Sequence, residues 1–345
     1  MSRDSITWVH LSDFHGGPPG EVPWEQIEAA LETDVRRMTE RLGAPDLVLF
    51  SGDLARTGAA EEYQRVDALL GQLERWTGRT LPVVAVPGNH DLVRPRSPWR
   101  YVALREYEEH PTLHRDLWDE GQPIVQPLFE PYTEWSKQRV VEPLLQRGYE
   151  VHVSDRIPGD LSVVFDKGQL RLGVVGLNTA WTHLQDDAPG NLHILAKQLY
   201  AALPPDPGGD PLRWFDGLDA ALLLTHHPRS YLNDRARRMY KKRIHPPRRF
   251  ALALFGHLHE QWGELTAGGG QRMRTYFQAP SLFGLEYHGP GHQPRPMGYA
   301  WGRWSKGGQV RVWPRRKIES EGAWEIGADL GYQEVEDEVG GVLVG

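Results

Sequence analysis

The chain has no cysteine, which excludes both disulfide bonds and thiolate metal sites. Any metal ion must therefore be held by histidine, aspartate, glutamate or asparagine. The sequence also has no apolar run near the roughly 20 residues that a membrane-spanning helix needs. Its first residues lead into a short apolar stretch without the longer hydrophobic core of a signal peptide. We therefore predict a cytoplasmic protein that does not bind a membrane.

An excess of positive charge is also missing, because the 345 residues carry a formal net charge of -7. The molecule as a whole is thus not an obvious polyanion binder. Residues 229–249 are an exception, since they hold nine Lys and Arg residues and a single acidic one. This basic segment could be a solvated helix face, or it could contact the phosphates of DNA or RNA. Both interpretations stay open.

Short apolar runs that alternate with helical patterns dominate the first 90 residues. Residues 6–11, 47–50 and 83–86 predict buried strands, and residues 24–42 and 59–76 have the apolar spacing of helices. Continuously apolar strands separated by helices indicate a parallel sheet covered by helices. Further elements are predicted later in the chain: a hairpin at 161–175, a helix at 192–203, and strands at 220–224, 250–255, 298–304 and 309–313.

Two segments interrupt or follow this pattern. Residues 93–160 are rich in Pro, Trp and Tyr and have helical stretches at 101–110 and 129–146. We predict that they form a helical insertion that caps the site within a domain of residues 1–315. Residues 316–345 lean acidic and are predicted to form a C-terminal tail.

Five of the predicted strands end in polar clusters. Strand carboxyl ends line one edge of a parallel sheet, so we expect these clusters to converge. Their candidate metal ligands are Asp13, His15, Asp53, Asn89, His226, His257 and His259. Oxygen and imidazole donors suit Mn²⁺, Fe, Zn²⁺ or Co²⁺ better than Ca²⁺. We therefore expect a site for transition-metal ions at this edge.

The spacing within the clusters has a simple geometric interpretation. In an extended chain, residues two apart point the same way, so Asp13 and His15 could reach one ion together. The same spacing separates His257 from His259, and the two could serve adjacent ions. The two oxygens of Asp53 could bridge both ions.

In order along the chain, the clusters read D-x-H, G-D, G-N-H-D, H and G-H-x-H. This series resembles the calcineurin-like metallophosphoesterase superfamily, over about residues 6–92 and 161–315. The resemblance implies an α/β fold: a β-sandwich flanked by helices in four layers, with a dimetal site at the carboxyl edge of the strands. It also implies two divalent transition-metal ions, with Mn²⁺ the first choice.

The resemblance further assigns a role to each residue. One metal would be held by Asp13, His15, Asp53 and His259, and the other by Asp53, Asn89, His226 and His257. His90 would be the catalytic histidine at the phosphate or the leaving oxygen, with Asp91 orienting it. His227 competes with its neighbour as a ligand, but relatives place the ligand two residues before proline, which favours His226.

Within the superfamily, residues 52–54, 176–179 and 198–199 look most like the branch of cyclic-nucleotide phosphodiesterases. Arg56 stands where many relatives carry a second acid, and it could contact substrate instead. Asn178 and Arg229 are further candidates for substrate contacts.

The function implied is hydrolysis of a phosphate ester. Two ions roughly 3.5–4 Å apart would bind phosphoryl oxygens and activate a hydroxide for attack on phosphorus. A small phosphodiester, such as a cyclic nucleotide, is the preferred substrate. A nuclease that binds nucleic acid through the basic segment, and a phosphomonoesterase, are the alternatives. A non-catalytic scaffold on the same fold would be expected to lose ligands, and none is missing here.

Overall fold

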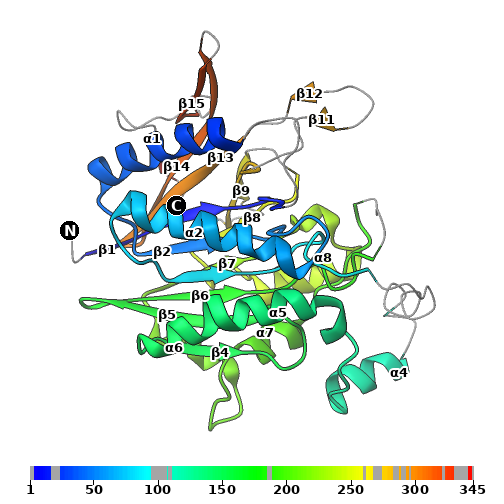
Figure 1. Ribbon diagram of the computed structural model, residues 1–345. Coiled ribbons are helices and arrows are strands. Elements are labelled where there is room, and N and C mark those ends of the chain that lie inside the picture. Colours follow the sequence, from blue (N-terminus) through cyan, green and yellow to red (C-terminus); the bar gives the residue numbers. More distant parts are fainter. Residues whose placement is uncertain are drawn as a thin grey trace.

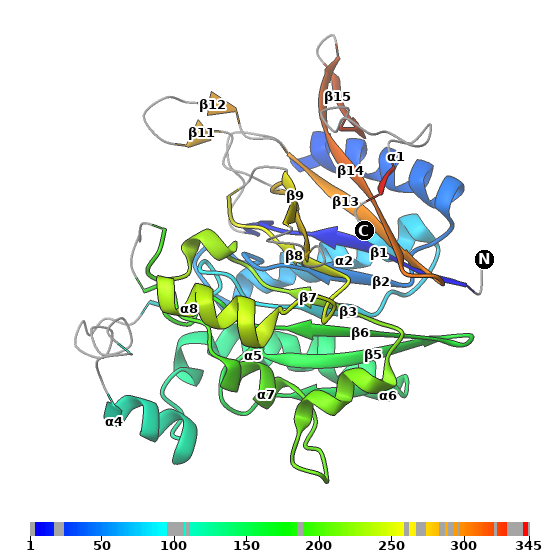
Figure 2. The same ribbon diagram turned by 180° about the vertical axis from the view of Figure 1, so that it is seen from behind.

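Two sheets packed face to face form the centre of the protein (Figure 1). The computed structural model describes residues 4–16, 24–94, 107, 111–184, 189–258, 262–266, 274–282, 287–288, 293–294, 297–320, 323–329 and 341–343. Within these residues each of the two sheets has seven strands, and helices cover their outer faces (Figures 1 and 2). The predicted α/β architecture of sheets flanked by helices is confirmed, with sheets that are mixed rather than purely parallel.

The first sheet holds the N-terminal strands at its centre. Its order is β15 (Ala323–Ala328), β14 (Gln309–Ser320), β13 (Gly298–Ser305), β1 (Ser5–Leu11), β2 (Leu47–Phe50) and β3 (Val83–Ala85), and β16 (Val342–Leu343) pairs with β14. Strands β1, β2 and β3 are parallel, and β13 runs antiparallel to β1. Helices α1 (Trp24–Leu42) and α2 (Tyr63–Thr77) pack on this sheet through apolar residues such as Leu31 and Val66.

The second sheet has the order β4 (Glu150–Val153), β5 (Leu161–Lys167), β6 (Leu170–Gly176), β7 (Ala220–Leu224), β8 (Leu252–Phe255), β10 (Arg274–Gln278) and β9 (Trp262–Thr266). Alternate residues of β7 face opposite ways: Leu222 and Leu224 join the core between the sheets, whereas Leu223 packs under α7 (Ala196–Ala202) and α8 (Asp234–Met239). Both faces are therefore buried, which explains why the strand is continuously apolar.

The predicted insertion is built from short helical turns that contact β3 of the first sheet and β4 of the second. They are α4 (Pro111–His114), η3 (Arg115–Asp119), η4 (Gln126–Phe129), α5 (Glu130–Ser136), η5 (Lys137–Val141) and α6 (Glu142–Gln146). Tyr132 donates a hydrogen bond to the Ala85 carbonyl at 2.9 Å, and Trp135 donates one to Asp67 at 3.0 Å. The predicted helix at 129–146 is confirmed, whereas the one at 101–110 lies outside the described residues apart from Tyr107.

Two predicted boundaries differ from the structure. The helix predicted at 192–203 begins only at Ala196, because Leu192 pairs with Leu232 in a β-bridge and Leu195 has an extended backbone. The boundary predicted at residue 315 falls inside β14, and β15 continues the same sheet. No helix in the described ranges is both long and apolar enough to span a membrane.

Candidate metal centre and active site

The carboxyl ends of five strands from both sheets meet at one edge of the protein. The Asp13 amide donates to the Gly52 carbonyl and the His15 amide to the Asp53 carbonyl, each at 3.0 Å, so the loops after β1 and β2 run side by side. Ligand atoms of Asp13, Asp53 and His226 lie within 4.8 Å of one another, as do those of His15, Asp53 and His90. Asp53 thus belongs to both groups, as expected of a bridging residue.

The local backbone is not the extended chain that the spacing had suggested. Strand β1 ends at Leu11, and Asp13, His15 and Asp53 have φ angles of 53°, 50° and 53°. His257 also has a positive φ, of 73°, so the geometric argument from alternating side chains was wrong. These four are among only five non-glycine residues with positive φ in the described part of the chain. Such left-handed conformations are strained and cluster at functional sites.

His226 shows that the site suits a cation. Its Nδ1 lies 2.8 Å from the Ser51 carbonyl oxygen, which can only accept, so Nδ1 carries the proton. In the neutral ring, Nε2 then presents a lone pair. It faces Asn89 Oδ1 at 3.1 Å and Asp53 Oδ2 at 3.3 Å, and both of these atoms also offer lone pairs. Such a group of acceptors needs either a proton or a metal ion at its centre.

The pKa values of His226 and Asp53 in the metal-free site show that negative charge gathers there. Burial alone would lower the pKa of His226, but the Asp53 carboxylate outweighs it and raises the pKa to about 9. Burial would likewise raise the pKa of Asp53, yet His226, His90 and His15 hold it well below its usual value. A field that favours the imidazolium cation also favours a divalent ion in its place.

Glycines let the backbone approach these ligands closely. A Cβ atom at Gly88 would lie 2.2 Å from Asp53 Oδ1, and one at Gly256 would lie 2.4 Å from Asp13 Oδ2. A side chain at either position would therefore push a carboxylate out of place. The oxygen and imidazole donors, together with the close approach of the backbone at Gly88 and Gly256, fit two divalent ions.

Of the remaining candidate ligands, the structure describes His257 and His15 but not His259. The His257 amide donates to Asp13 Oδ2 at 3.0 Å, and its ring Nδ1 lies 3.2 Å from His226 Nε2. His15 Nε2 lies 4.0 Å from Asp53 Oδ2, the same oxygen that His226 Nε2 faces at 3.3 Å. His259 lies outside the described residues, so its role as a ligand stays a prediction.

His90 stands beside the ligands, and it is oriented differently from what was expected. Its Nδ1 donates to the Arg56 carbonyl at 2.7 Å, which leaves Nε2 as the atom that can turn to a substrate. Asp91 does not perform this orienting role in the structure. Its carboxylate accepts from the Leu54, Ala55 and Gly88 amides and from the Tyr63 hydroxyl, and so ties the Asp53 loop to the His90 loop.

Asp91 is fully buried, and its ionisation reflects this position. Burial and the neighbouring Asp53 charge raise the pKa of Asp91 to about 6, against the opposing effect of its backbone hydrogen bonds. The His90 ring contacts the Arg56 carbonyl and not Asp91, whose carboxylate accepts from four other donors.

His227, the neighbour that competed with His226 as a ligand, has both ring nitrogens engaged. Its Nδ1 lies 3.0 Å from Thr179 Oγ1, and its Nε2 lies 2.8 Å from His183 Nδ1. Burial lowers the pKa of His183 to about 4, with Asp53 opposing and His226 adding to the effect. Sequence reasoning missed His183, because no recognisable motif surrounds it.

The three candidate substrate contacts occupy different environments. Asn178 is fully buried: its amide donates to the Pro158 carbonyl and accepts from the Ala180 N–H, so it fixes its own loop. Arg56 is exposed beside His90. Arg229 stacks over the Tyr276 ring at 5.4 Å and lines a cavity of about 440 Å³.

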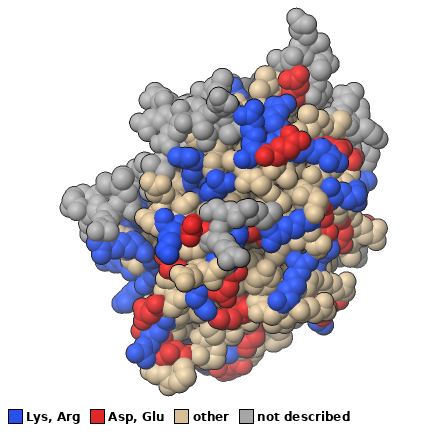
Figure 3. All heavy atoms as spheres, turned by 90° about the vertical axis from the view of Figure 1, so that its left-hand side faces the viewer, with Lys and Arg blue, Asp and Glu red and all other residues tan. Residues whose placement is uncertain are grey.

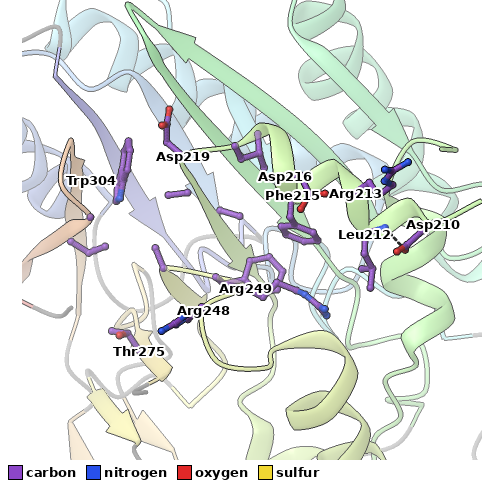
Figure 4. Close-up of a pocket in the computed structure, with 17 residues that line it drawn as sticks. Asp210, Leu212, Arg213, Phe215, Asp216, Asp219, Arg248, Arg249, Thr275 and Trp304 are labelled. Carbon is purple, nitrogen blue, oxygen red and sulfur yellow. Dashed lines mark hydrogen bonds between the residues drawn. The ribbon is translucent and has the colours of Figure 1, made fainter. Parts of the chain in front are cut away.

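This cavity adjoins the candidate metal centre through His227 and Thr179, and apolar side chains such as Leu232 and Phe255 also line it. A second cavity, of about 560 Å³, lies at the opposite edge, where β7 and β8 begin (Figure 4). Arg248, Phe215 and Trp304 line it, and it contains none of the candidate ligands. The smaller cavity is therefore the one placed for the chemistry.

Comparison with known proteins places this site in a family. The model of the calcineurin-like phosphoesterase family matches residues 6–261, which is most of the chain. The chain therefore belongs to the calcineurin-like phosphoesterases. A protein from Arcobacter nitrofigilis named "Probable glycerophosphodiester phosphodiesterase GpdQ" is 29% identical over 85 residues, which are 24% of this chain and 29% of that protein. This match spans less than a third of the relative's length.

Solved structures with a similar chain trace include two phosphatases. A dimetal phosphatase from Danio rerio has a TM-score of 0.42 and 12% identity, over 93% of this chain and 98% of that chain. A purple acid phosphatase from yellow lupin (Lupinus luteus) seeds has a TM-score of 0.45 and 11% identity, over 90% of this chain and 51% of that chain.

Proposed function

We propose that this protein is a dinuclear metal-dependent phosphoesterase that hydrolyses small phosphodiesters. One observation carries the proposal: the lone pairs of Asp53 Oδ2 and Asn89 Oδ1 converge within 3.3 Å on the Nε2 atom of His226. In the metal-free protein a proton on His226 Nε2 satisfies these acceptors, and a divalent ion can take the place of this proton. Family membership supports the same reaction class.

The ligand sets follow the sequence prediction. Asp13, His15, Asp53 and His259 would hold one ion, and Asp53, Asn89, His226 and His257 would hold the other. Mn²⁺ is our first choice, with Fe, Zn²⁺ and Co²⁺ as alternatives. Two divalent ions at this position would polarise the phosphoryl group and lower the pKa of a water molecule, so that it can attack phosphorus.

The protein's own contribution centres on His90. With Nδ1–H bound to the Arg56 carbonyl, His90 can direct Nε2 at the phosphate or at the departing oxygen. Asp91 supports it indirectly, because it clamps the loops that carry Asp53 and His90. We propose Asp91 as a positioning residue.

A small diester is favoured over a nucleic acid by the surroundings of the site. The cavity beside His227 is about 440 Å³ and offers the Arg229 guanidinium together with apolar walls. This suits one compact substituent of a diester. The name of the Arcobacter nitrofigilis relative also refers to a small phosphodiester.

The basic segment gives weaker support to the nuclease alternative. Within it, Arg237 pairs with Asp234 at 3.0 Å, and Arg249 donates to the Ile244 carbonyl at 3.2 Å, so two of its cations are engaged internally. A nuclease would need a continuous basic track to follow a strand. Figure 3 shows the face at the left of Figure 1, where β1, β2 and β3 of the first sheet begin, and there Lys and Arg side chains are interspersed with Asp and Glu.

A substrate panel tests the proposal. Purified protein loaded with Mn²⁺ should hydrolyse bis(p-nitrophenyl) phosphate and either a cyclic nucleotide or a glycerophosphodiester. The kcat/KM for these diesters should be at least about tenfold above that for p-nitrophenyl phosphate or single-stranded DNA, because binding energy at the substituent lowers the barrier. EDTA should abolish all activity. A clear preference for the monoester, or no hydrolysis of any ester, would contradict the proposal.

A charge-neutralised variant distinguishes a diesterase from a nuclease. The residues to replace are Arg238, Lys241 and Lys242, which are exposed on α8 and η8 (Tyr240–Ile244). A nuclease should lose DNA cleavage, with a salt dependence flattened by roughly one unit of slope per lost phosphate contact. Hydrolysis of bis(p-nitrophenyl) phosphate should stay unchanged in the same variant, since this substrate has no flanking phosphates.

A further inference from the structure

Three buried side chains form a hydrogen-bonded chain beside the proposed metal centre. Thr179 Oγ1 lies 3.0 Å from His227 Nδ1, and His227 Nε2 lies 2.8 Å from His183 Nδ1. All three residues expose less than 5% of their surface. The His183 and His227 rings both lie close to His257, with centroids 5.8 and 4.4 Å away. The chain thus ends beside His257, at the edge that carries the candidate ligands.

The direction of these hydrogen bonds follows from the hydroxyl of Thr179. Its oxygen already accepts the backbone N–H of His227 at 2.9 Å. Because the side chain is buried, its O–H proton must also find an acceptor, and His227 Nδ1 is the one within reach. The neutral His227 ring then carries its proton on Nε2 and donates it to His183 Nδ1. This leaves the proton of neutral His183 on Nε2.

Among the described residues, none forms a hydrogen bond with His183 Nε2. We propose that His183 is a second active-site imidazole: its Nε2–H donates a hydrogen bond to a non-bridging phosphoryl oxygen of the substrate, and Thr179 and His227 are positioning residues that set its tautomer. The proposal rests on the proposed phosphoesterase function and extends it. His90 would act beside His15, and His183 beside His257.

The physical role is stabilisation of developing charge. When a nucleophile adds to phosphorus, negative charge grows on the non-bridging oxygens, and a fixed N–H donor in a water-poor site stabilises it without reorganisation. The His183 ring keeps its orientation, because turning it would break the hydrogen bond to the buried His227. No proton leaves His183 in this role, so the leaving group's basicity should not affect its contribution.

Variants of His183 test the proposal directly. His183→Ala should lower kcat on bis(p-nitrophenyl) phosphate by about 10²-fold, the loss typical of one such donor. His183→Gln should recover part of the rate, because its amide N–H can reach the position of Nε2. Metal content by mass spectrometry should stay at the wild-type value in both. As a matched control, His152→Ala, on β4, removes a histidine bonded to the Ala201 carbonyl and should not alter kcat.

Two further measurements do not depend on turnover. Nitrogen-15 imidazole spectra of the metal-free protein should show the proton of both His183 and His227 on Nε2. Thr179→Val should disturb this pattern and lower kcat, whereas Thr179→Ser, which keeps the hydroxyl, should preserve both. With Mn²⁺ bound, orthovanadate should bind His183→Ala at least about tenfold more weakly than the wild type, because the variant lacks a donor to the anion.

Three results would overturn the proposal: a kcat within threefold of wild type for a folded, metal-loaded His183→Ala; loss of metal in that variant comparable with Asp53→Ala; or a proton on His183 Nδ1. If the wild type hydrolyses no ester, the proposed function fails, and His183 is judged by the orthovanadate and imidazole measurements alone. Unchanged orthovanadate affinity in His183→Ala would then refute its role independently.

Discussion

The two sheets bring different chemistry to the same edge. Strands β1, β2 and β3 of the first sheet end in the proposed oxygen ligands Asp13, Asp53 and Asn89, and β1 also leads to one proposed imidazole ligand, His15. Strands β7 and β8 of the second end in the imidazoles His226 and His257. The oxygens supply negative charge and can bridge two ions, whereas neutral imidazoles fix direction through a single lone pair. Neither sheet alone offers a complete coordination sphere.

Hydrogen bonds join the two halves at the site itself. His226 of the second sheet donates to the Ser51 carbonyl of the first at 2.8 Å, and the His257 amide donates to Asp13 Oδ2 at 3.0 Å. The stacking of the sheets therefore assembles the candidate centre, and binding of ions should in turn hold the sheets together. The expected consequences differ for each half, and they can be ranked by size.

The largest effect is expected from the bridging oxygen ligand. Asp53→Ala should lose most of the bound metal and lower kcat by more than about 10³-fold, since this carboxylate belongs to both groups of ligand atoms. Metal analysis after reconstitution with Mn²⁺, together with a diesterase assay, measures both quantities. Asp67→Ala is a suitable control, because Asp67 contacts Trp135 and Arg139 away from the site. Retention of both ions in Asp53→Ala would exclude a bridging role.

A smaller loss, without loss of metal, is expected at His90. His90→Ala should retain both ions yet lower kcat by about 10²–10⁴-fold, the range of general acid catalysis. The loss should shrink for diesters whose leaving group is as weakly basic as p-nitrophenolate. Rates across a series of aryl leaving groups test this. If metal is lost as readily as in Asp53→Ala, His90 is a ligand and not an acid.

The smallest effect is expected at Gly88, which lies beside the proposed oxygen ligand Asp53. In Gly88→Ala the new Cβ would meet Asp53 Oδ1 at 2.2 Å, so the carboxylate must move and Mn²⁺ affinity should fall by about 10–100-fold. Gly217→Ala is the matched control, because a Cβ there meets nothing within 4 Å. Calorimetric titration with Mn²⁺ compares the two. Equal affinities for both variants would show that the close approach of Gly88 has no consequence for the metal.

The sequence predicted well which described side chains meet at this edge, because each stands shortly after an apolar strand, and their role as metal ligands stays a prediction. Strands β2 and β7 were confirmed at their predicted bounds, and the position of Asp53 and His226 follows from them. The conformation of the loops could not be predicted in this way. Asp and His adopt left-handed φ angles more often than most residues, but this weak preference does not tell which of them, such as Asp13 and His257, will do so.

Contacts between loops that are distant in the sequence could not be predicted either. His183 meets His227 across 44 residues, and Asp91 reaches the Leu54 amide across 37, so neither contact follows from a local pattern. The end of the chain posed a different problem. Its acidic composition suggested a tail, yet residues 315–320 of β14 pair with residues 323–328 of β15 and so continue the first sheet.

Anomalous scattering from crystals grown with Mn²⁺ tests the central claim most directly. The account predicts two peaks at the edge where the sheets meet, roughly 3.5–4 Å apart, each within bonding distance of one oxygen of Asp53. One peak should also contact Asn89, His226 and His257, so that both sheets share it. A single peak, or two peaks that do not share Asp53, would contradict the account.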